Sequence, residues 1–130
     1  MKRGFTLLEI IVVIIIIGVL ATLGFTQYVR VIEKGRTAEA KTILGQLRSA
    51  EIVRYQETGA YAFIGNLYVE APTPPCVVDG THYFSYTCAA ATGRCSAARC
   101  QGNLGKLPGV PAPGYSIWLD IDGTWGGSAG

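Results

Sequence analysis

The chain has 130 residues, of which 49% are hydrophobic and only 15% are charged, whereas ordinary soluble domains carry about 25% charged residues. Its formal net charge is +2, and the 11 basic residues are spread along the chain, so no basic cluster indicates nucleic-acid binding. The length allows one domain with an attached segment. The low charge indicates that part of the chain is surrounded by lipid or protein rather than by water.

The first predicted element is an apolar helix that follows Met1-Lys2-Arg3-Gly4. Counted from Phe5, about 20 residues are predominantly apolar, which is long enough for a helix to cross a bilayer. The two basic residues before it place the N-terminus in the cytoplasm and the remaining chain outside the inner membrane. A secretory signal peptide is disfavoured, because Ala21-Thr22-Leu23 is a poor cleavage box and the run is long. A plain signal anchor remains open on hydropathy alone.

One carboxylate, Glu9, lies near the start of this apolar helix. A carboxylate deep in a bilayer costs about 2–3 kcal/mol, so Glu9 is expected to be shallow, protonated or paired. The simple alternative is that its side chain reaches the cytoplasmic headgroups, because it lies close to the start of the helix. A plain anchor has no use for this residue.

The order Lys-Arg-Gly, Phe-Thr-Leu-Leu-Glu and a long apolar run resembles the N-terminus of type IV prepilins and type II secretion pseudopilins. The resemblance implies that a prepilin peptidase cuts between Gly4 and Phe5 and that Phe5 then becomes the N-methylated first residue. It also implies that Glu9 neutralises the N-terminal amine of a neighbouring subunit. Such a pair would fix the axial register of subunits in an apolar filament core, where an unpaired charge is costly.

The sequence departs from that family in one respect, because no proline occurs before Pro72. Gly18 matches a helix glycine that is common in the family, and Gly24 lies six residues further on. Each glycine weakens a helix by about 1 kcal/mol relative to alanine. Any bending or melting of the helix in a filament is therefore expected to depend on Gly18 and Gly24.

The pattern stays helical from Gln27 to about Glu57, but it becomes amphipathic. Apolar residues recur three and four positions apart, and charged residues fill most of the other face. Thr58-Gly59 predicts the end of the helix, because glycine is favoured just after a helix. The predicted organisation is a leader of residues 1–4, a membrane and filament-core segment of residues 5–26, an amphipathic segment of residues 27–58 and a head of residues 59–130.

The predicted head contains short strands and many glycine and proline residues. Residues 83–87 and 115–120 are rich in strand-forming side chains. Asp122-Gly123 predicts a tight turn, and a return strand begins near Thr124. The last residues, 126–130, are predicted to be frayed. Two or three antiparallel strands packed on the long helix give an α+β fold of the pilin type.

Four cysteines, Cys76, Cys88, Cys95 and Cys100, lie in this head. Outside the inner membrane thiols are oxidised, and small heads use disulfides to reinforce a thin core. Three pairings are possible, and spacing alone does not choose among them. Short loops favour Cys76–Cys88 with Cys95–Cys100. A zinc site is the alternative, although the chain has no C-x-x-C pair and His82 is its one histidine.

A catalytic site is not indicated by any motif. Asp79, His82 and Ser85 lie close together in the sequence, but a triad is defined by its geometry, and three such residues in a polar loop occur easily by chance. We therefore predict that the chain is not an enzyme, and we assign it no cofactor.

A calcium site is the one metal site that the resemblance suggests, because pseudopilins bind calcium in loops near the C-terminus. Asp120 and Asp122 would be the candidate ligands. Calcium needs six or more oxygen ligands, and two carboxylates supply too few. A hairpin turn with solvated aspartates is the favoured interpretation.

Two arginines, Arg94 and Arg99, lie among the aromatic residues of the head. They are interpreted either as part of a binding surface or as scattered surface cations above strand aromatics that pack on the helix. The sequence does not separate these two interpretations.

The resemblance implies that the chain is a structural pilin that polymerises through its N-terminal helix. The expected partners are other copies of the chain, a prepilin peptidase, an inner-membrane platform protein and, indirectly, a cytoplasmic assembly ATPase. The expected location is a single-pass inner-membrane protein with an extracytoplasmic head, and later a filament in the periplasm or outside the cell. A type II secretion pseudopilin, a membrane-tethered binding subunit that does not polymerise and an anchored enzyme are the alternatives.

Overall fold

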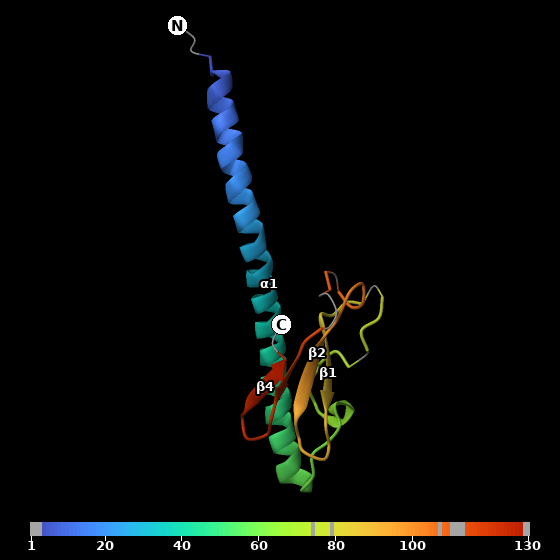
Figure 1. Cartoon of the computed structure of the whole chain (residues 1–130). Helices are drawn as coiled ribbons and strands as arrows, with labels where there is room; N and C mark the ends of the chain where they lie inside the picture. Colours follow the sequence, from blue (N-terminus) through green and yellow to red (C-terminus); the bar gives the residue numbers. More distant parts are fainter. Residues whose placement is uncertain (1–3, 74, 79, 107, 110–113, 129–130) are drawn as a thin grey trace. The chain divides into compact units, whose positions relative to one another are not determined.

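The computed structural model describes residues 4–73, 75–78, 80–106, 108–109 and 114–128. It contains one long α-helix, α1 (Leu7–Thr58), a short 3₁₀ helix, η1 (Ile64–Asn66), and four strands (Figure 1). The chain divides into two compact units, Met1–Arg36 and Thr37–Gly130. The fold is α+β and pilin-like, which confirms the predicted class.

The helix α1 is continuous over 52 residues. It ends where the sequence predicts, because Gly59 adopts a φ of 74°, a left-handed conformation that glycine reaches without strain. The backbone N–H of Gly59 donates to the carbonyl oxygen of Tyr55 at 2.8 Å. The last turn of the helix is therefore closed by the residue that follows it.

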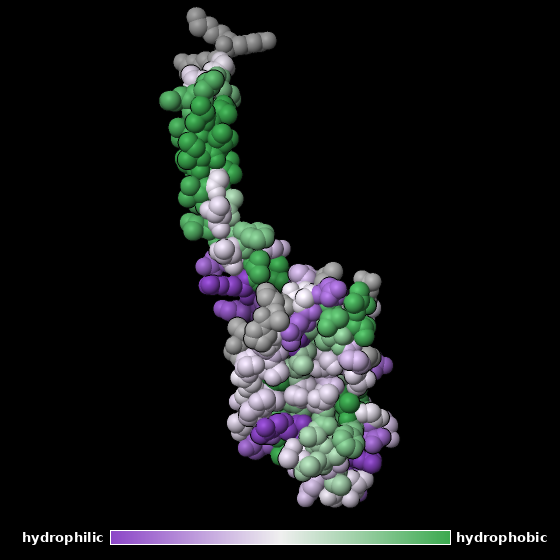
Figure 2. Space-filling model, turned by 45° about the vertical axis from the view of Figure 1, so that its right-hand side comes forward, coloured by the Kyte–Doolittle hydropathy of each residue, from purple (hydrophilic) through white to green (hydrophobic). Residues whose placement is uncertain are grey.

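In the first unit, the apolar side chains of the helix are exposed as far as Val31. Every described residue from Gly4 to Val31 is exposed, and hydrophobic side chains cover this part of the molecule in Figure 2. Among the described residues, α1 is the one helix that is long and apolar enough to cross a membrane, judged by length and composition. These apolar side chains are unfavourable in water and are expected to be surrounded by lipid or by other protein chains.

In the second unit, one stripe of α1 is fully buried. Its members are spaced four, three and four residues apart, which places them on one face of a helix: Ala40, Leu44, Leu47 and Glu51. The three apolar members of this stripe share a hydrophobic core with alternate residues of the sheet, namely Phe84, Tyr86, Cys88, Cys95, Ala97, Ile117 and Leu119.

The sheet is an antiparallel meander in the order β1-β2-β3-β4. Its strands are β1 (Phe84–Cys88), β2 (Cys95–Arg99), β3 (Ser116–Leu119) and β4 (Trp125–Ser128). Buried and more exposed residues alternate along β1, β2 and β3, as expected for strands with one face on a core. The register pairs Cys88 with Cys95 and Ala97 with Ile117.

The structure confirms the predicted strands near residues 83–87 and 115–120 and adds a strand that the sequence pattern missed. The missed strand is β2, whose sequence Cys-Ser-Ala-Ala-Arg is poor in strand formers. Its small Ala97 is completely buried, so packing against the core decides its conformation.

The prediction that residues 126–130 are frayed is wrong for Gly126–Ser128, which belong to β4. Gly126 lies opposite Trp118 in the register, and a Cβ atom at this position would overlap the Trp118 ring. Glycine is required at Gly126 because the indole ring occupies the space of a side chain. Residues 129–130 lie outside the described part.

Candidate assembly site

The N-terminus of α1 is closed by a reciprocal capping box between Thr6 and Glu9. Glu9 Oε2 accepts hydrogen bonds from the Thr6 backbone N–H and the Thr6 hydroxyl, both at 2.8 Å. The Glu9 backbone N–H donates to Thr6 Oγ1 at 3.2 Å. The box satisfies backbone donors that otherwise lack a partner at a helix start.

Sequence reasoning treated Glu9 as a pairing group and overlooked Thr6. The signal was present, because Thr-x-x-Glu before an apolar run is the sequence pattern of a capping box. Glu9 Oε1 has no hydrogen-bond partner among the described residues. One carboxylate oxygen is thus held at the helix start, and the other is available to a second group.

Phe5 and the helix after it present a continuous apolar surface. Phe5 is 85% exposed, and the isoleucine and valine side chains of the next turns are each at least 42% exposed. Burial of one such side chain contributes about 1.5–3 kcal/mol. The exposed members are Ile10, Ile11, Val12, Val13, Ile14, Ile15, Ile16, Ile17 and Val19. Exposure of so many apolar side chains to water is therefore strongly unfavourable.

The polar groups within this surface are satisfied by the helix itself. The Thr22 hydroxyl donates to the Val19 carbonyl at 2.8 Å, and the Thr26 hydroxyl donates to the Leu23 carbonyl at 3.1 Å. Internal hydrogen bonds of this kind allow threonine to lie in an apolar environment. The segment is therefore compatible with lipid or with the side chains of another helix.

Gly18 and Gly24 lie within the uninterrupted helix. A Cβ atom at either position would meet no atom within 4 Å. Packing within the isolated chain therefore does not require glycine there. Their predicted role in helix flexibility stays a prediction.

The head contains two disulfides, and their pairing differs from the one that loop length favoured. Cys76 is bonded to Cys100, and Cys88 is bonded to Cys95. The preference for Cys76–Cys88 and Cys95–Cys100 was wrong because strand β2 was not foreseen. The β1–β2 register places Cys88 directly opposite Cys95, with the Cα atoms 4.1 Å apart. Because zinc binds thiolates, cysteines in disulfides are not zinc ligands.

The two calcium candidates are both engaged within the protein. Arg94 forms a bidentate ion pair with Asp120, with both N–O distances 2.7 Å, and its guanidinium also lies over the Trp118 ring. The Thr124 backbone N–H donates to Asp122 Oδ1 at 2.8 Å, and this bond lowers the pKa of Asp122. Gly123, with a φ of 93°, completes the predicted tight turn.

Glu51 is a buried carboxylate that the sequence analysis did not single out. It is fully buried, and its Oε2 accepts a hydrogen bond from the Ala62 backbone N–H at 3.0 Å. Burial raises the pKa of Glu51. The helical spacing of the buried stripe could have revealed it, because Glu51 follows Leu47 by four residues on the same face.

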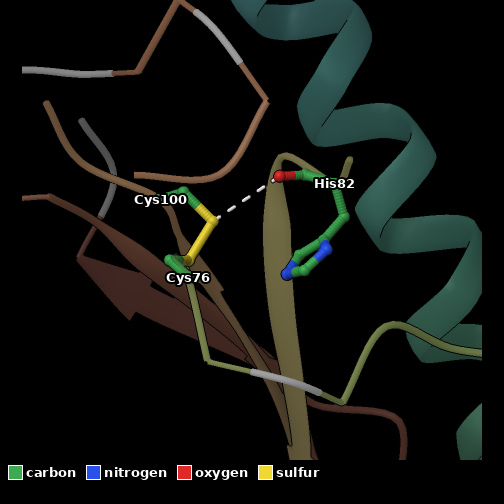
Figure 3. Close-up of side chains that lie close together, drawn as sticks. All are labelled: Cys76, His82 and Cys100. Atoms are coloured by element: carbon green, nitrogen blue, oxygen red, sulfur yellow. Dashed lines mark hydrogen bonds between the residues drawn. A yellow bond between two sulfur atoms is a disulfide. The ribbon is translucent and has the colours of Figure 1, made fainter. Parts of the chain in front are cut away.

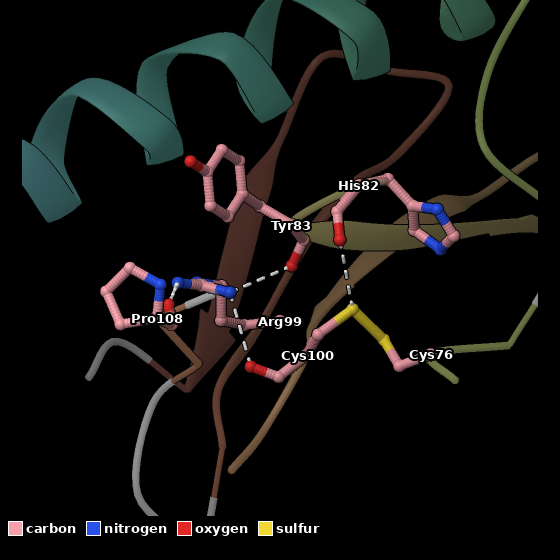
Figure 4. Close-up of a disulfide and its surroundings, with 6 residues drawn as sticks. All are labelled: Cys76, His82, Tyr83, Arg99, Cys100 and Pro108. Atoms are coloured by element: carbon pink, nitrogen blue, oxygen red, sulfur yellow. Dashed lines mark hydrogen bonds between the residues drawn. A yellow bond between two sulfur atoms is a disulfide. The ribbon is translucent and has the colours of Figure 1, made fainter. Parts of the chain in front are cut away.

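Arg99 is also buried, with an exposed fraction of 2%, so it is not a surface cation. Its guanidinium donates to the carbonyl oxygens of Tyr83, Cys100 and Pro108 at 3.1, 3.2 and 3.0 Å (Figure 4). Arg99 thus joins the start of β1 to the loop after β2. Arg94 lies instead at the exposed ion pair with Asp120, so the two arginines form no common binding surface.

The sequence neighbours that suggested a triad are not arranged as one where the structure describes them. Asp79 lies outside the described residues. Ser85 is on the face of β1 opposite that of Phe84 and Tyr86, because strand side chains alternate. His82 lies beside the Cys76–Cys100 disulfide (Figure 3).

Residues 1–25 match the family model of the prokaryotic N-terminal methylation motif. The match covers the basic leader, Gly4, Phe5, Glu9 and most of the exposed apolar helix. No solved structure matches the chain.

Two curated relatives are major pilins. The chain is 32% identical over 113 residues to the type IV major pilin protein PilA of Myxococcus xanthus, which covers 87% of this chain and 46% of that protein. It is 36% identical over 50 residues to the type IV major fimbrial protein FimA of Dichelobacter nodosus, which covers 38% of this chain and 32% of that protein. The chain thus spans less than half the length of these relatives.

The N-terminal motif covers the capped start of the helix and most of its exposed apolar residues. The long match to PilA extends beyond the helix into the head, whereas the FimA match is shorter. The chain is therefore similar in sequence to type IV major pilins, and its residues 1–25 match the prokaryotic N-terminal methylation motif.

Proposed function

We propose that this chain is a structural subunit of a type IV pilus or a similar filament. The observation that carries the proposal is the exposed apolar surface of α1, most of which lies within the residues that match the methylation motif. A surface of this size needs lipid before assembly and neighbouring helices after it. The relatives PilA and FimA, which are named as major pilin and major fimbrial proteins, support the same function.

Cleavage between Gly4 and Phe5 would change both the charge and the hydrophobicity of the N-terminus. It removes Lys2 and Arg3, which leaves 11 − 2 = 9 basic residues against 9 acidic ones. It also creates a cationic amine on Phe5, one residue before the Thr6 of the capping box. Loss of the two basic anchors makes it easier for the helix to leave the membrane.

In the assembled filament, Glu9 would pair with the Phe5 amine of another copy. The capping box holds Glu9 Oε2 on Thr6 and leaves Oε1 for that second cation. The helix start thereby remains capped while the carboxylate forms an ion pair between subunits. Because an unpaired charge in an apolar core is costly, this pair would select one axial register.

The proposed partners are other copies of the chain, a prepilin peptidase that cuts and methylates Phe5, a platform protein of the inner membrane and an assembly ATPase that acts indirectly. The proposed orientation places the N-terminus in the cytoplasm and the head outside the inner membrane. The two disulfides fit that compartment.

A structural role is proposed in preference to the alternatives. The named relatives are pilins, which favours a pilin over a secretion pseudopilin. We also propose that Asp120 and Asp122 stabilise the β3–β4 turn and that calcium is not a structural ion, because Arg94 and Thr124 already bind their carboxylates.

Intact mass and N-terminal fragmentation of protein from sheared filaments test the proposal. We expect a chain that begins at N-methylated Phe5 and is about 4 Da lighter than the reduced form because two disulfides are closed. A chain that begins at Met1, or that is absent from filaments, would contradict both cleavage and polymerisation.

A pair of variants separates the charge of Glu9 from its capping role. Glu9→Gln keeps an oxygen acceptor for Thr6 but removes the charge, so we expect a large loss of sheared filaments. Thr6→Ala keeps the charge and breaks the box, so we expect a smaller loss. Equal filament yields for Glu9→Gln and the wild type would refute the proposed ion pair.

A further inference from the structure

The Cys76–Cys100 disulfide has a histidine ring beside it. One ring nitrogen of His82 and the two sulfur atoms lie within 4.8 Å of one another, and Figure 3 shows the ring directed toward the disulfide. His82 Nε2 is buried and has no hydrogen-bond partner among the described residues. A buried imidazole nitrogen without a partner is unfavourable, so the oxidised site leaves one polar group unsatisfied.

Opening of the disulfide would supply the missing partners. A thiolate at Cys100 can accept a hydrogen bond from an imidazole N–H. The Cys100 Sγ also lies 3.7 Å from the backbone carbonyl oxygen of His82 (Figure 4), which can accept a hydrogen bond from a Cys100 thiol. His82 can therefore form a hydrogen bond with the released Cys100 sulfur whether that sulfur is a thiolate or a thiol.

The two cysteines of this disulfide also differ in exposure. Cys76 is partly exposed, whereas Cys100 has an exposed fraction of only 1%. Cys76, as the more exposed of the two residues, would be the one that an external thiolate attacks, and Cys100 would then leave on the side of His82. Exchange is faster when the attacked sulfur is accessible and the leaving thiolate is stabilised.

The Cys88–Cys95 disulfide has the opposite surroundings. Its exposed fractions are 6% and 0%, and a carboxylate oxygen of Glu51 and the two sulfurs lie within 4.8 Å of one another. A nearby carboxylate disfavours a thiolate, because like charges repel. Loop length affects the equilibrium stability of a disulfide, and the longer Cys76–Cys100 loop would favour that bond. It does not slow the attack of a thiolate on a partly exposed cysteine.

We propose that Cys76–Cys100 is a thiol-reactive site of the head and that His82 assists its opening. The co-substrate is a dithiol. One thiolate of the dithiol bonds to Cys76 Sγ, the Cys76–Cys100 bond breaks, and Cys100 leaves with the electron pair. The second thiol then attacks the mixed disulfide and releases Cys76. The dithiol is oxidised to a disulfide, and its two protons are transferred to the sulfurs of Cys76 and Cys100.

The test is timed reduction of the oxidised full-length chain in detergent micelles with dithiothreitol, followed by alkylation and mass spectrometry of each cysteine. We expect Cys76 and Cys100 to be alkylated about tenfold faster than Cys88 and Cys95. Simultaneous alkylation of the four cysteines, or earlier alkylation of Cys88 and Cys95, would overturn the proposal.

Two variants test the histidine, and the Cys88–Cys95 pair serves as the reference for folding within each sample. His82→Phe and His82→Gln should each lower the ratio of the two opening rates by about threefold or more. A variant that unfolds would expose both disulfides and accelerate both reactions, which the reference pair reveals. An unchanged ratio in both variants would overturn the role of His82 and with it the proposal.

Discussion

The two units of this chain use apolar residues in opposite ways. From Gly4 to Val31 every described residue is exposed, although the segment is the most hydrophobic of the chain. In the second unit, the apolar stripe of α1 is buried against the sheet. One helix thus contains a segment that is exposed as far as Val31 and a segment that shares a buried core with the sheet.

This difference shows that the two units are stabilised by different surroundings. The stability of the head depends on its own core, its buried polar groups and its disulfides. The environment of the first unit must come from lipid or from other copies, since apolar surface in water is unfavourable. Substitutions in the first unit should therefore affect insertion and assembly, and substitutions in the second should affect folding.

The largest effect on assembly is expected from a charged residue in the middle of the exposed apolar helix. For Ile15→Lys we expect loss of sheared filaments, because a lysine at the centre of a membrane helix costs about 2.5–3.5 kcal/mol on insertion and is costly again in an apolar filament core. Ile15→Leu is the matched control and should assemble normally. Filament yield by shearing and immunoblot measures the effect.

The same variant should leave the head intact. In detergent, the thermal midpoint of the head should match that of the wild type within about 2 °C, because Ile15 is 59% exposed and exposed substitutions change stability little. A lowered midpoint for Ile15→Lys would show that the two units depend on each other for stability.

The next largest effect compares one leucine from each unit. Leu44 is completely buried, so Leu44→Ala should cost about 2–5 kcal/mol of unfolding free energy and lower the thermal midpoint of the head by about 10 °C or more. Leu20 is 63% exposed, so Leu20→Ala should leave that midpoint unchanged. Near-UV circular dichroism during heating in detergent distinguishes them, and similar midpoints for the two variants would refute the division.

A smaller effect concerns pH and the buried Glu51. Burial raises the pKa of Glu51 above its ordinary value of 4.5, so the unfolded chain loses this proton at a lower pH than the folded head. The free energy of unfolding therefore falls as the pH rises from about 4.5 through the raised pKa, and the contribution of the protonated group is fully present only below that range. Glu51→Gln should remove this dependence.

The measurement is the difference in unfolding free energy between Glu51→Gln and the wild type at several pH values. We expect the unfolding free energy of the variant to rise relative to that of the wild type as the pH rises. The amide never ionises and can still accept the hydrogen bond from the Ala62 N–H. Glu57→Gln, an exposed substitution on the same helix, is the control and should show no such trend. A constant difference between pH 4 and pH 8 for Glu51→Gln would contradict the prediction.

The local patterns predicted the long helix well, because its signals are contained in neighbouring residues. The apolar run, the amphipathic period and Thr58-Gly59 each depend on residues within a few turns. The strands near Phe84 and Ile117 were also predicted from their own side chains. The strand β2 was not, because an alanine-rich segment becomes a strand only through its partners.

The error in disulfide pairing has the same origin. Cys88 and Cys95 face each other only once β1 and β2 pair in their register, and loop length does not contain that information. The buried roles of Arg99 and Glu51 likewise depend on carbonyl and amide groups distant in sequence. The Thr6–Glu9 capping box, in contrast, was readable from four consecutive residues and was overlooked.

The smallest expected effect is at the surface of the head, where Arg94 and Asp120 form an exposed ion pair. Exposed pairs contribute little to stability, so Asp120→Asn should shift the thermal midpoint by no more than about 2 °C. Because both carboxylate oxygens already bind Arg94, calcium or a chelator should not move the midpoint of the wild type. If calcium raised the midpoint of the wild type but not that of Asp120→Asn, the head would owe part of its stability to an external ion. The head would then depend on a partner outside the chain at the β3–β4 turn, as the exposed part of α1 depends on lipid or on other copies.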